Sequence, residues 1–255
     1  MSDALLSAPA MGQTLLIDLG NTRIKWRFGN GPTFAAATLE ECFAALSSSA
    51  APAQVLACVV GAEARYQAVR DYCRHTWQIE PQRLQVSRNA LGVHNHYDDL
   101  SQQGCDRWAA VLGARAQFPA QTLLIVSAGT ALVVDTLTQD GQYLGGTISP
   151  GLGLMKQALF QGTAKLPLAD GQHQDFPRNT HDAITTGCLR AIKGIILESM
   201  DTLAQQHIPI DQILLFGGDA AAIHSLLNGK AKTVDNLVLD GLYALHCAAE
   251  GVFTQ

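Results

Sequence analysis

The chain has 255 residues, of which 47% are hydrophobic and 15% are charged, and its formal net charge at pH 7 is −5. A chain of this length can bury a sizeable core, as one large domain or as two modest ones. The acidic balance, without any run of Lys or Arg, argues against a protein that binds nucleic acid through phosphate contacts. No apolar stretch approaches the roughly 20 residues that span a bilayer, which argues against a membrane protein.

The N-terminal residues and the cysteines indicate the cellular compartment in which we expect the protein. The first residues, MSDALLSAPAMG, lack a basic segment and a long apolar run, so we expect a loose tail rather than a secretory signal. The six cysteines are far apart and form no C-x-x-C pair. Several lie in apolar patterns, where a free cysteine behaves as a small hydrophobic residue. We therefore expect a reducing compartment, the cytoplasm.

The first half of the chain is predicted to open on a β-hairpin, residues 14–29, with the sequence TLLIDLGNTRIKWRFG. Apolar and β-branched runs on both sides of a short polar turn are typical of paired strands. Strands and helices then alternate, and the predicted elements are a strand at Thr33–Thr38, a helix at Leu39–Ser48, a strand at Gln54–Val60, a helix at Ala64–Trp77, a strand at Arg83–Val86 and a helix at Asp106–Gln117.

The second half repeats this arrangement from residue 122, where the sequence is TLLIVSAGTALVVDTL. Both hairpins begin Thr-Leu-Leu-Ile and reach a glycine close to a threonine before the second strand. The elements predicted after the second hairpin are a strand at Tyr143–Ile148, helices at Leu152–Phe160 and His181–Gln206, a strand at Gln212–Phe216, a helix at Ala220–Leu227, a strand at Lys232–Val234 and a helix at Leu239–Thr254.

A repeat of this length indicates two related half-molecules rather than a solenoid. Strands that open each half and then alternate with helices predict mixed sheets with covered faces. We expect an α/β protein with an N-terminal domain at 14–118 and a C-terminal domain at 119–255.

The turn of the first hairpin carries Asp18, Gly20, Asn21 and Thr22 at a strand end. Consecutive backbone N–H groups in such a turn can form an anion nest, and glycine lets a phosphate approach closely. Asp18 would then hold a cation or its water, and Lys25 either adds a positive charge or points to solvent. A plain hairpin is the alternative for one such turn. Two turns at matching places favour two loops that face one nucleotide across a cleft.

The segment Gly104-Cys105-Asp106-Arg107-Trp108 leads into an apolar helix of small residues. Phosphoryl transfer to an alcohol needs a base near the hydroxyl, and Asp106 near a helix N-terminus suits that role. The planar fork of Arg107 suits a substrate carboxylate. A helix-capping aspartate followed by a surface arginine is the alternative.

Two further glycine-rich segments, residues 145–151 (GGTISPG) and Gly217-Gly218, each follow a predicted strand. Glycine permits a close approach of the backbone to a ligand. Each segment can equally be a tight connection from a strand to a helix, so residue types alone leave both interpretations open.

Together these residues resemble the actin-like ATPase and sugar-kinase superfamily, and within it the type III pantothenate kinases. The motifs that carry the resemblance are DLGNTRIK (18–25), NHYDDLSQQGCDRW (95–108), SAGTA (127–131), GGTISPG (145–151), NTHDAITTG (179–187) and Gly217-Gly218-Asp219. The resemblance implies two similar ribonuclease-H-like domains with mixed sheets and a nucleotide cleft between them. It also implies ATP-dependent phosphorylation of pantothenate to 4′-phosphopantothenate, the first step of coenzyme A biosynthesis.

The resemblance assigns roles to individual residues. Asp106 is the proton acceptor, and pantothenate is bound by Tyr97, Gly104, Cys105, Asp106 and Arg107, with Thr180 reaching in from the partner subunit of a homodimer. The ATP site comprises Asp18, Leu19, Gly20, Asn21, Thr22, Arg23, Ile24, Lys25, Gly129 and Thr130. Mg²⁺ accompanies ATP and contacts Asp18, directly or through water.

One position departs from the family pattern. The second phosphate loop usually begins with an aspartate that helps to bind a monovalent cation, K⁺ or NH₄⁺, and Ser127 stands there in this chain. Because serine carries no charge, the requirement for a monovalent cation is in doubt. Two other functions stay open from the residues alone, namely a kinase of another small acceptor such as a sugar or an acetate-like compound, and a catalytically idle nucleotide-binding regulator.

Overall fold

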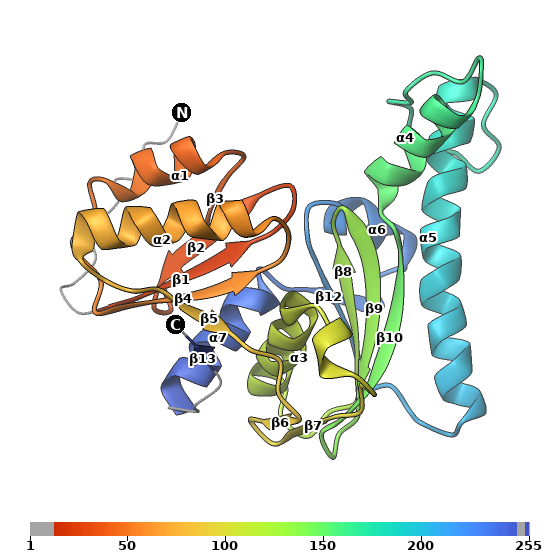
Figure 1. The fold of residues 1–255 in the computed structure, drawn as a ribbon. Coiled ribbons are helices and arrows are strands. Elements are labelled where there is room, and N and C mark those ends of the chain that lie inside the picture. The colour runs from red at the N-terminus through yellow and green to blue at the C-terminus, as the bar shows by residue number, and fades with distance from the viewer. Residues whose placement is uncertain (1–12, 249–252, 255) are drawn as a thin grey trace. The chain divides into compact units, whose positions relative to one another are not determined.

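The structure is a computed structural model that describes residues 13–248 and 253–254. The predicted loose tail, residues 1–12, lies outside the described residues. The chain forms two compact units (Figure 1). The first unit comprises the described parts of Met1–Gly92, Tyr97–Gln117 and Asn236–Gln255, and the second comprises Val93–His96 and Phe118–Asp235.

The first unit is built on a mixed sheet with the strand order β13-β5-β4-β1-β2-β3. Its strands are β1 (Thr14–Leu19), β2 (Ile24–Phe28), β3 (Phe34–Ala36), β4 (Gln54–Val59), β5 (Gln82–Leu84) and β13 (Phe253–Thr254). β1, β2 and β3 form an antiparallel meander, whereas β4 runs parallel to β1 and β5 parallel to β4. Every residue of β1 is buried, as expected for a central strand.

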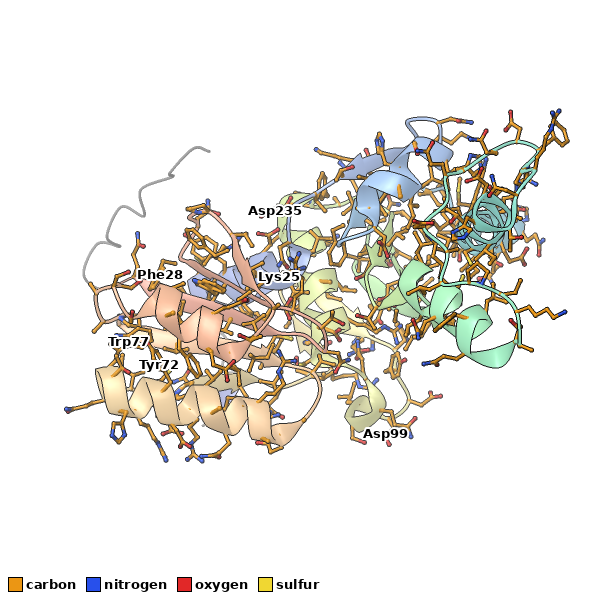
Figure 2. The ribbon with its side chains drawn as sticks, turned by 90° about the horizontal axis from the view of Figure 1, so that it is seen from above. Lys25, Phe28, Tyr72, Trp77, Asp99 and Asp235 are labelled. Carbon is orange, nitrogen blue, oxygen red and sulfur yellow. The ribbon has the colours of Figure 1, made fainter. Side chains whose placement is uncertain are left out.

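One face of this sheet is covered by α1 (Leu39–Leu46) and α2 (Glu63–Trp77) (Figure 1). Thr38 begins α1 with a capping box, in which its side chain and that of Glu41 accept each other's backbone N–H. The ring of Tyr72 stacks on Phe43 and meets Trp77 edge-on, and Tyr72 and Trp77 lie next to each other in Figure 2. These contacts attach both helices to the core.

The other face is covered by α3 (Cys105–Gln117) and α7 (Leu237–Ala248). Arg27 of β2 forms a 2.6 Å ion pair with Asp240 of α7 on the strand side opposite to Trp26. The two helices approach closely at two glycines. A Cβ at Gly113 would lie 2.2 Å from the carbonyl oxygen of Leu237, and one at Gly241 would lie 1.9 Å from that of Ala109. Close packing on α7 therefore fixes the axis of α3 and with it the position of its first residues.

The second unit contains a mixed sheet with the strand order β12-β11-β8-β9-β10-β7. Its strands are β7 (Val93–Asn95), β8 (Leu123–Ala128), β9 (Ala131–Leu137), β10 (Gln142–Pro150), β11 (Gln212–Phe216) and β12 (Ala231–Thr233). Its helices are α4 (Leu152–Gly162), α5 (Thr180–Gln205) and α6 (Ala220–Leu226). α5 runs alongside the sheet, and α4 lies at the N-terminal end of α5 (Figure 1).

The two sheets confirm the predicted duplication. The order β5-β4-β1-β2-β3 in the first corresponds to β12-β11-β8-β9-β10 in the second. In each, the opening hairpin is antiparallel and its first strand pairs in parallel with the strand that follows the first covering helices. Asp18 on β1 and Ser127 on β8 occupy matching places, because each is one residue from the end of its strand.

Some predicted boundaries were wrong. The last helix was expected at Leu239–Thr254, but α7 ends at Ala248, and Phe253–Thr254 instead pairs with β5 as β13. The sequence also did not predict β6 (Asn89–Ala90) or β7, which are two and three residues long and contain asparagine.

The domain boundary at residues 118 and 119 stays a prediction. In the compact units α7 belongs with the first unit, where it packs on α3 and β1. Among the described residues, no helix combines the length and the apolar character that crossing a membrane would require.

Candidate functional site

The turn between β1 and β2 is held from one side by α2. The guanidinium of Arg65 donates to the carbonyl oxygens of Gly20 and Asn21, the latter at 3.1 Å. In a trans peptide the C=O and the following N–H point in opposite directions. The N–H groups of Asn21 and Thr22 therefore point away from Arg65. Successive N–H groups oriented in this way can serve as the donors of an anion nest, and this role stays a prediction.

Two glycines shape this turn. Gly61 has a φ of +116°, and a Cβ there would lie 2.7 Å from the side-chain oxygen of Asn21. A Cβ at Gly20 would lie 3.0 Å from the carbonyl oxygen of Arg23. Both positions therefore favour glycine for steric reasons, and a side chain at either one would reshape the turn.

Asp18 and Lys25 are directly opposite each other in the β1–β2 ladder, so their side chains share one face. Asp18 is only 8% exposed. Burial raises the pKa of Asp18 to about 7, against a partial lowering by Lys25 and a further increase from Asp106. Lys25 is thus half-buried on the same face of the sheet as Asp18, and its role at the phosphates stays a prediction. A buried carboxylate with a raised pKa is suited to binding a cation, because the positive charge would stabilise the ionised form.

Asp106 lies in the first turn of α3, where the helix dipole favours a negative charge. Its Oδ1 accepts a 2.8 Å hydrogen bond from the backbone N–H of Arg107. A Cβ at residue 104 would lie 2.5 Å from the same oxygen, so Gly104 leaves the room that this carboxylate occupies. Because Asp106 also raises the pKa of Asp18, the two carboxylates share one electrostatic environment within the first unit.

Arg107 is not a surface arginine, since it is only 6% exposed. Its Nη1 donates a 2.7 Å hydrogen bond to the hydroxyl of Tyr97, and its guanidinium carbon lies 5.4 Å from the centre of that ring. Arg88 in turn donates a 2.7 Å bond to the carbonyl oxygen of Tyr97. The alternative of an exposed arginine was therefore wrong, and the structure brings Tyr97, Asp106 and Arg107 together.

Cys105, the first residue of α3, lies next to a second thiol. Its Sγ is 3.2 Å from the Sγ of Cys58 on β4 and 3.2 Å from the carbonyl oxygen of Val59. Hydrogen bonding from Cys58 lowers the pKa of Cys105 below that of an ordinary thiol. Cys58 is also the parallel partner of Asp18 in the sheet.

In the second unit, both glycine-rich segments pack against the turn between β8 and β9. A Cβ at Gly151 would lie 2.0 Å from the carbonyl oxygen of Gly129, and one at Gly217 would lie 2.3 Å from that of Ala128. The backbone N–H of Gly151 donates to the carbonyl oxygen of Thr130 at 2.9 Å. Both segments are also strand-to-helix connections, since they lead into α4 and α6. The two interpretations of these glycines are therefore compatible.

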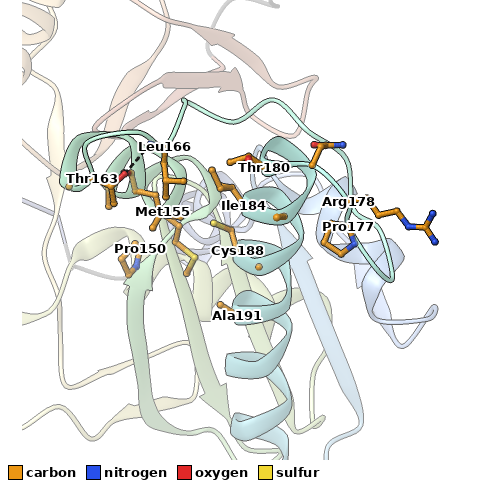
Figure 3. Close-up of a pocket in the computed structure, with 16 residues that line it drawn as sticks. Pro150, Met155, Thr163, Leu166, Pro177, Arg178, Thr180, Ile184, Cys188 and Ala191 are labelled. Atoms are coloured by element: carbon orange, nitrogen blue, oxygen red, sulfur yellow. Dashed lines mark hydrogen bonds between the residues drawn. The ribbon is translucent and has the colours of Figure 1, made fainter.

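Ser127 and Thr180 also belong to the second unit. Ser127 is half-buried, with Val133 and Phe216 as its partners on the two neighbouring strands. Thr180 is the exposed first residue of α5, which is capped by Asn179. Its place is at the rim of a mostly apolar pocket of about 1090 Å³ between α4 and α5 (Figure 3). Met155, Leu166, Ile184 and Cys188 gather in this pocket.

Sequence reasoning missed four residues of the site, namely Arg65, Gly61, Arg88 and Cys58. Arg65 and Cys58 lie within a regular helix and strand pattern, Gly61 in an ordinary connection and Arg88 in a polar loop. No local signal distinguishes them. Each becomes important only through contacts that the fold creates, such as that of Arg65 with a turn 44 residues away.

Sequence comparisons with known proteins agree on one family. The sequence profile for type III pantothenate kinase matches residues 14–202. A type III pantothenate kinase of Aromatoleum aromaticum is 42% identical over 233 residues, which cover 89% of this chain and 95% of that protein. One from Azoarcus sp. is 40% identical over 243 residues, covering 92% of this chain and 90% of the relative.

The solved structure of Ta0583, an archaeal actin homologue, matches 93% of this chain and 100% of its own with a TM-score of 0.52. At 9% identity this likeness concerns the fold alone. It agrees with the expected architecture, an α/β protein with two similar actin-like domains and mixed sheets.

Proposed function

Because the chain belongs to the type III pantothenate kinase family, we propose that it transfers the γ-phosphoryl group of ATP to the primary hydroxyl of pantothenate. The product is 4′-phosphopantothenate, the first intermediate on the way to coenzyme A. The observation that carries the proposal is the cluster of Tyr97, Asp106 and Arg107 at the start of α3. It supplies a carboxylate base and a buried guanidinium in one place.

Asp106 accepts the proton of the attacking hydroxyl. A positioned base of this kind contributes a factor of about 10²–10⁴ to the rate. Arg107 binds the carboxylate of pantothenate through its planar fork, and Tyr97 holds the guanidinium in place. Gly104 and Cys105 belong to the same segment and contact pantothenate through their backbone.

The turn from Asp18 to Lys25 binds phosphate groups of ATP. The N–H groups of Asn21 and Thr22 donate to phosphate oxygens, and Gly20 keeps the approach open. Leu19, Arg23 and Ile24 complete this segment, and ATP binding is also assigned to Gly129 and Thr130 in the turn between β8 and β9. Bound Mg²⁺ would neutralise charge on the phosphates. The buried carboxylate of Asp18 fits a role next to the ion or its water. Lys25 offsets only part of the cost of burying its negative charge, and a cation would offset more.

A requirement for K⁺ or NH₄⁺ stays open in the proposal. Ser127 offers a hydroxyl where the family pattern has a carboxylate, and a neutral ligand binds a cation less strongly. We expect activity without added K⁺ or NH₄⁺, or a weak dependence on these ions.

We propose a homodimer that operates in the cytoplasm, with Thr180 reaching the substrate site of the partner. Large apolar side chains are exposed on and near α4, among them Ile148, Leu154 and Phe160, with exposed fractions of 63%, 45% and 45%. A face of this kind is typical of a protein–protein interface.

The proposal is tested by incubating the purified protein with Mg²⁺-ATP and a panel of acceptors, with ADP release as the readout. The panel contains pantothenate, a sugar, acetate and pantothenol, the alcohol that retains the hydroxyl but lacks the carboxylate. We expect rapid release with pantothenate and slow release with pantothenol. Equal release with another acceptor would favour the other-acceptor kinase, and no release with any acceptor would favour the idle regulator.

A further inference from the structure

Two thiols meet where β4 ends and α3 begins. The Sγ atoms of Cys58 and Cys105 are 3.2 Å apart, a distance that must shorten by about 1 Å to reach the roughly 2.05 Å of a disulfide bond. Both residues belong to the first unit, so their separation does not depend on how the two units are arranged.

The environments of the two thiols differ. Cys105 is partly exposed and is the first residue of α3, where the helix N-terminus favours a thiolate. Cys58 is 0% exposed. An oxidant therefore reaches Cys105 first, and Cys58 is placed to react with the oxidised sulfur from inside.

We propose that Cys105 is a site of reversible oxidation by peroxides and forms a disulfide bond with Cys58. The Cys105 thiolate attacks one peroxide oxygen, the O–O bond breaks, and a sulfenic acid and hydroxide result. Cys58 then attacks the Cys105 sulfur, the S–S bond forms, and the hydroxyl leaves with the thiol proton as water. Two thiols lose two electrons in total, and the peroxide is reduced to two molecules of water.

This bond would disturb the candidate site on both sides. Cys105 immediately precedes Asp106, and Cys58 pairs with Asp18 in the sheet. Drawing the two sulfurs together shifts the start of α3 towards β4. A misplacement of about 1 Å at a reacting group can cost about 10²-fold in rate. We therefore expect the oxidised form to lose kinase activity, a consequence that rests on the proposed function.

The first experiment concerns the chemistry alone and uses the full-length protein. It is treated with hydrogen peroxide, denatured, and its free thiols are titrated and alkylated before digestion without reductant. We expect two fewer free thiols than the six of the sequence and a peptide pair linked through Cys58 and Cys105. Dithiothreitol should restore all six. An unchanged thiol count, or a linkage between other cysteines, would overturn the proposal.

The second experiment compares Cys58→Ala with Cys42→Ala. Cys42 is also a buried cysteine of the first unit, and its side chain packs in the core with α1 and α2. Circular dichroism verifies that both variants fold. The linked peptide should be absent from Cys58→Ala and unchanged in Cys42→Ala. Persistence of a Cys105 linkage in Cys58→Ala would contradict the assignment of the resolving thiol.

Activity is then measured on wild-type protein before and after oxidation. We expect a loss of at least tenfold that dithiothreitol reverses. Full activity of protein shown by mass to carry the disulfide would refute the regulatory consequence. Absence of kinase activity even before oxidation would instead count against the proposed function, and the thiol titration distinguishes the two failures.

Discussion

Arg107 donates a 2.7 Å hydrogen bond to the hydroxyl of Tyr97 while its guanidinium lies 5.4 Å from the centre of the same ring. The arginine is thereby fixed in two ways, through its charge against the ring face and through its donor geometry. A buried guanidinium fixed in this manner is prepared for a flat, charged ligand group such as a carboxylate.

Tyr97→Phe retains the ring and removes the hydroxyl that accepts from Arg107. We expect the KM for pantothenate to rise by about tenfold, since hydrogen bonds to charged groups contribute about 1.5–3 kcal/mol. The KM for ATP should stay nearly constant. Steady-state kinetics with each substrate varied in turn provides the measurement, and pantothenol is the control, because its use should change little. A selective rise in the KM for ATP would place Tyr97 at the nucleotide instead.

Gly20→Val should raise the KM for ATP at least tenfold and leave that for pantothenate nearly unchanged, because the added side chain reshapes the turn around the carbonyl of Arg23. Arg65→Met should act in the same direction, since it removes the donor that orients the turn. Arg70→Met is the matched control, as Arg70 lies on the same helix but pairs with Glu80. If folded Gly20→Val protein uses ATP normally, the turn is only a hairpin connection.

The pH dependence of stability should report on Asp18. In the folded protein its pKa is about 7, compared with 3.8 for an ordinary aspartate. Between pH 4 and pH 7 the folded state retains a proton that the unfolded chain has lost. The free energy of unfolding therefore falls as the pH rises through this window. Above pH 7 the stabilisation from the proton on Asp18 is absent. At about 1.4 kcal/mol for each pKa unit, the effect reaches up to about 4 kcal/mol.

Asp18→Asn cannot ionise, so its stability relative to wild type should improve from pH 4 to pH 8. Thermal unfolding at both pH values, in EDTA and without nucleotide, measures this difference. A difference that does not vary with pH would show that Asp18 titrates normally. The same variant should use Mg²⁺-ATP less well, because it lacks the carboxylate that we propose next to the ion or its water.

Much of this fold could be predicted from its apolar runs and their repetition. The two Thr-Leu-Leu-Ile hairpins became β1–β2 and β8–β9. Apart from the C-terminal end of α7, the helices and longer strands fell within a few residues of their expected bounds. β6 and β7 were not predicted, because strands of two or three residues are too short to show an alternation of apolar and polar residues.

The site could be predicted only in part, for a physical reason. A turn motif indicates which residues could bind a ligand, but not which contacts hold their side chains in position. The sequence did not show which side chains share a face with Lys25, and only the strand register puts Lys25 on the same face as Asp18. Similarly, the burial of Arg107 depends on Tyr97, ten residues away, and on a loop whose path no local pattern specifies.

Thr180→Val and Asp106→Asn test the proposed exchange of residues between subunits. If Thr180 completes the partner's site, each variant is inactive alone, whereas a mixed dimer carries one site with both residues intact. Mixing the variants under conditions of subunit exchange should restore up to about a quarter of wild-type activity, because half of the dimers are hybrids with one intact site each. No recovery, with exchange verified by differently tagged subunits, would place Thr180 outside the partner's site.

The central claim is that Asp106 serves as the base in phosphorylation of pantothenate, and one measurement tests it most directly. Purified wild-type protein and Asp106→Asn are incubated with Mg²⁺-ATP and pantothenate, and 4′-phosphopantothenate is quantified by mass spectrometry while ATP affinity is measured on the same samples. The account predicts product from wild type, a rate about 10²–10⁴-fold lower in Asp106→Asn, and nearly equal ATP affinities. Wild-type product formation that persists undiminished in Asp106→Asn, or no product from wild type at all, would contradict it.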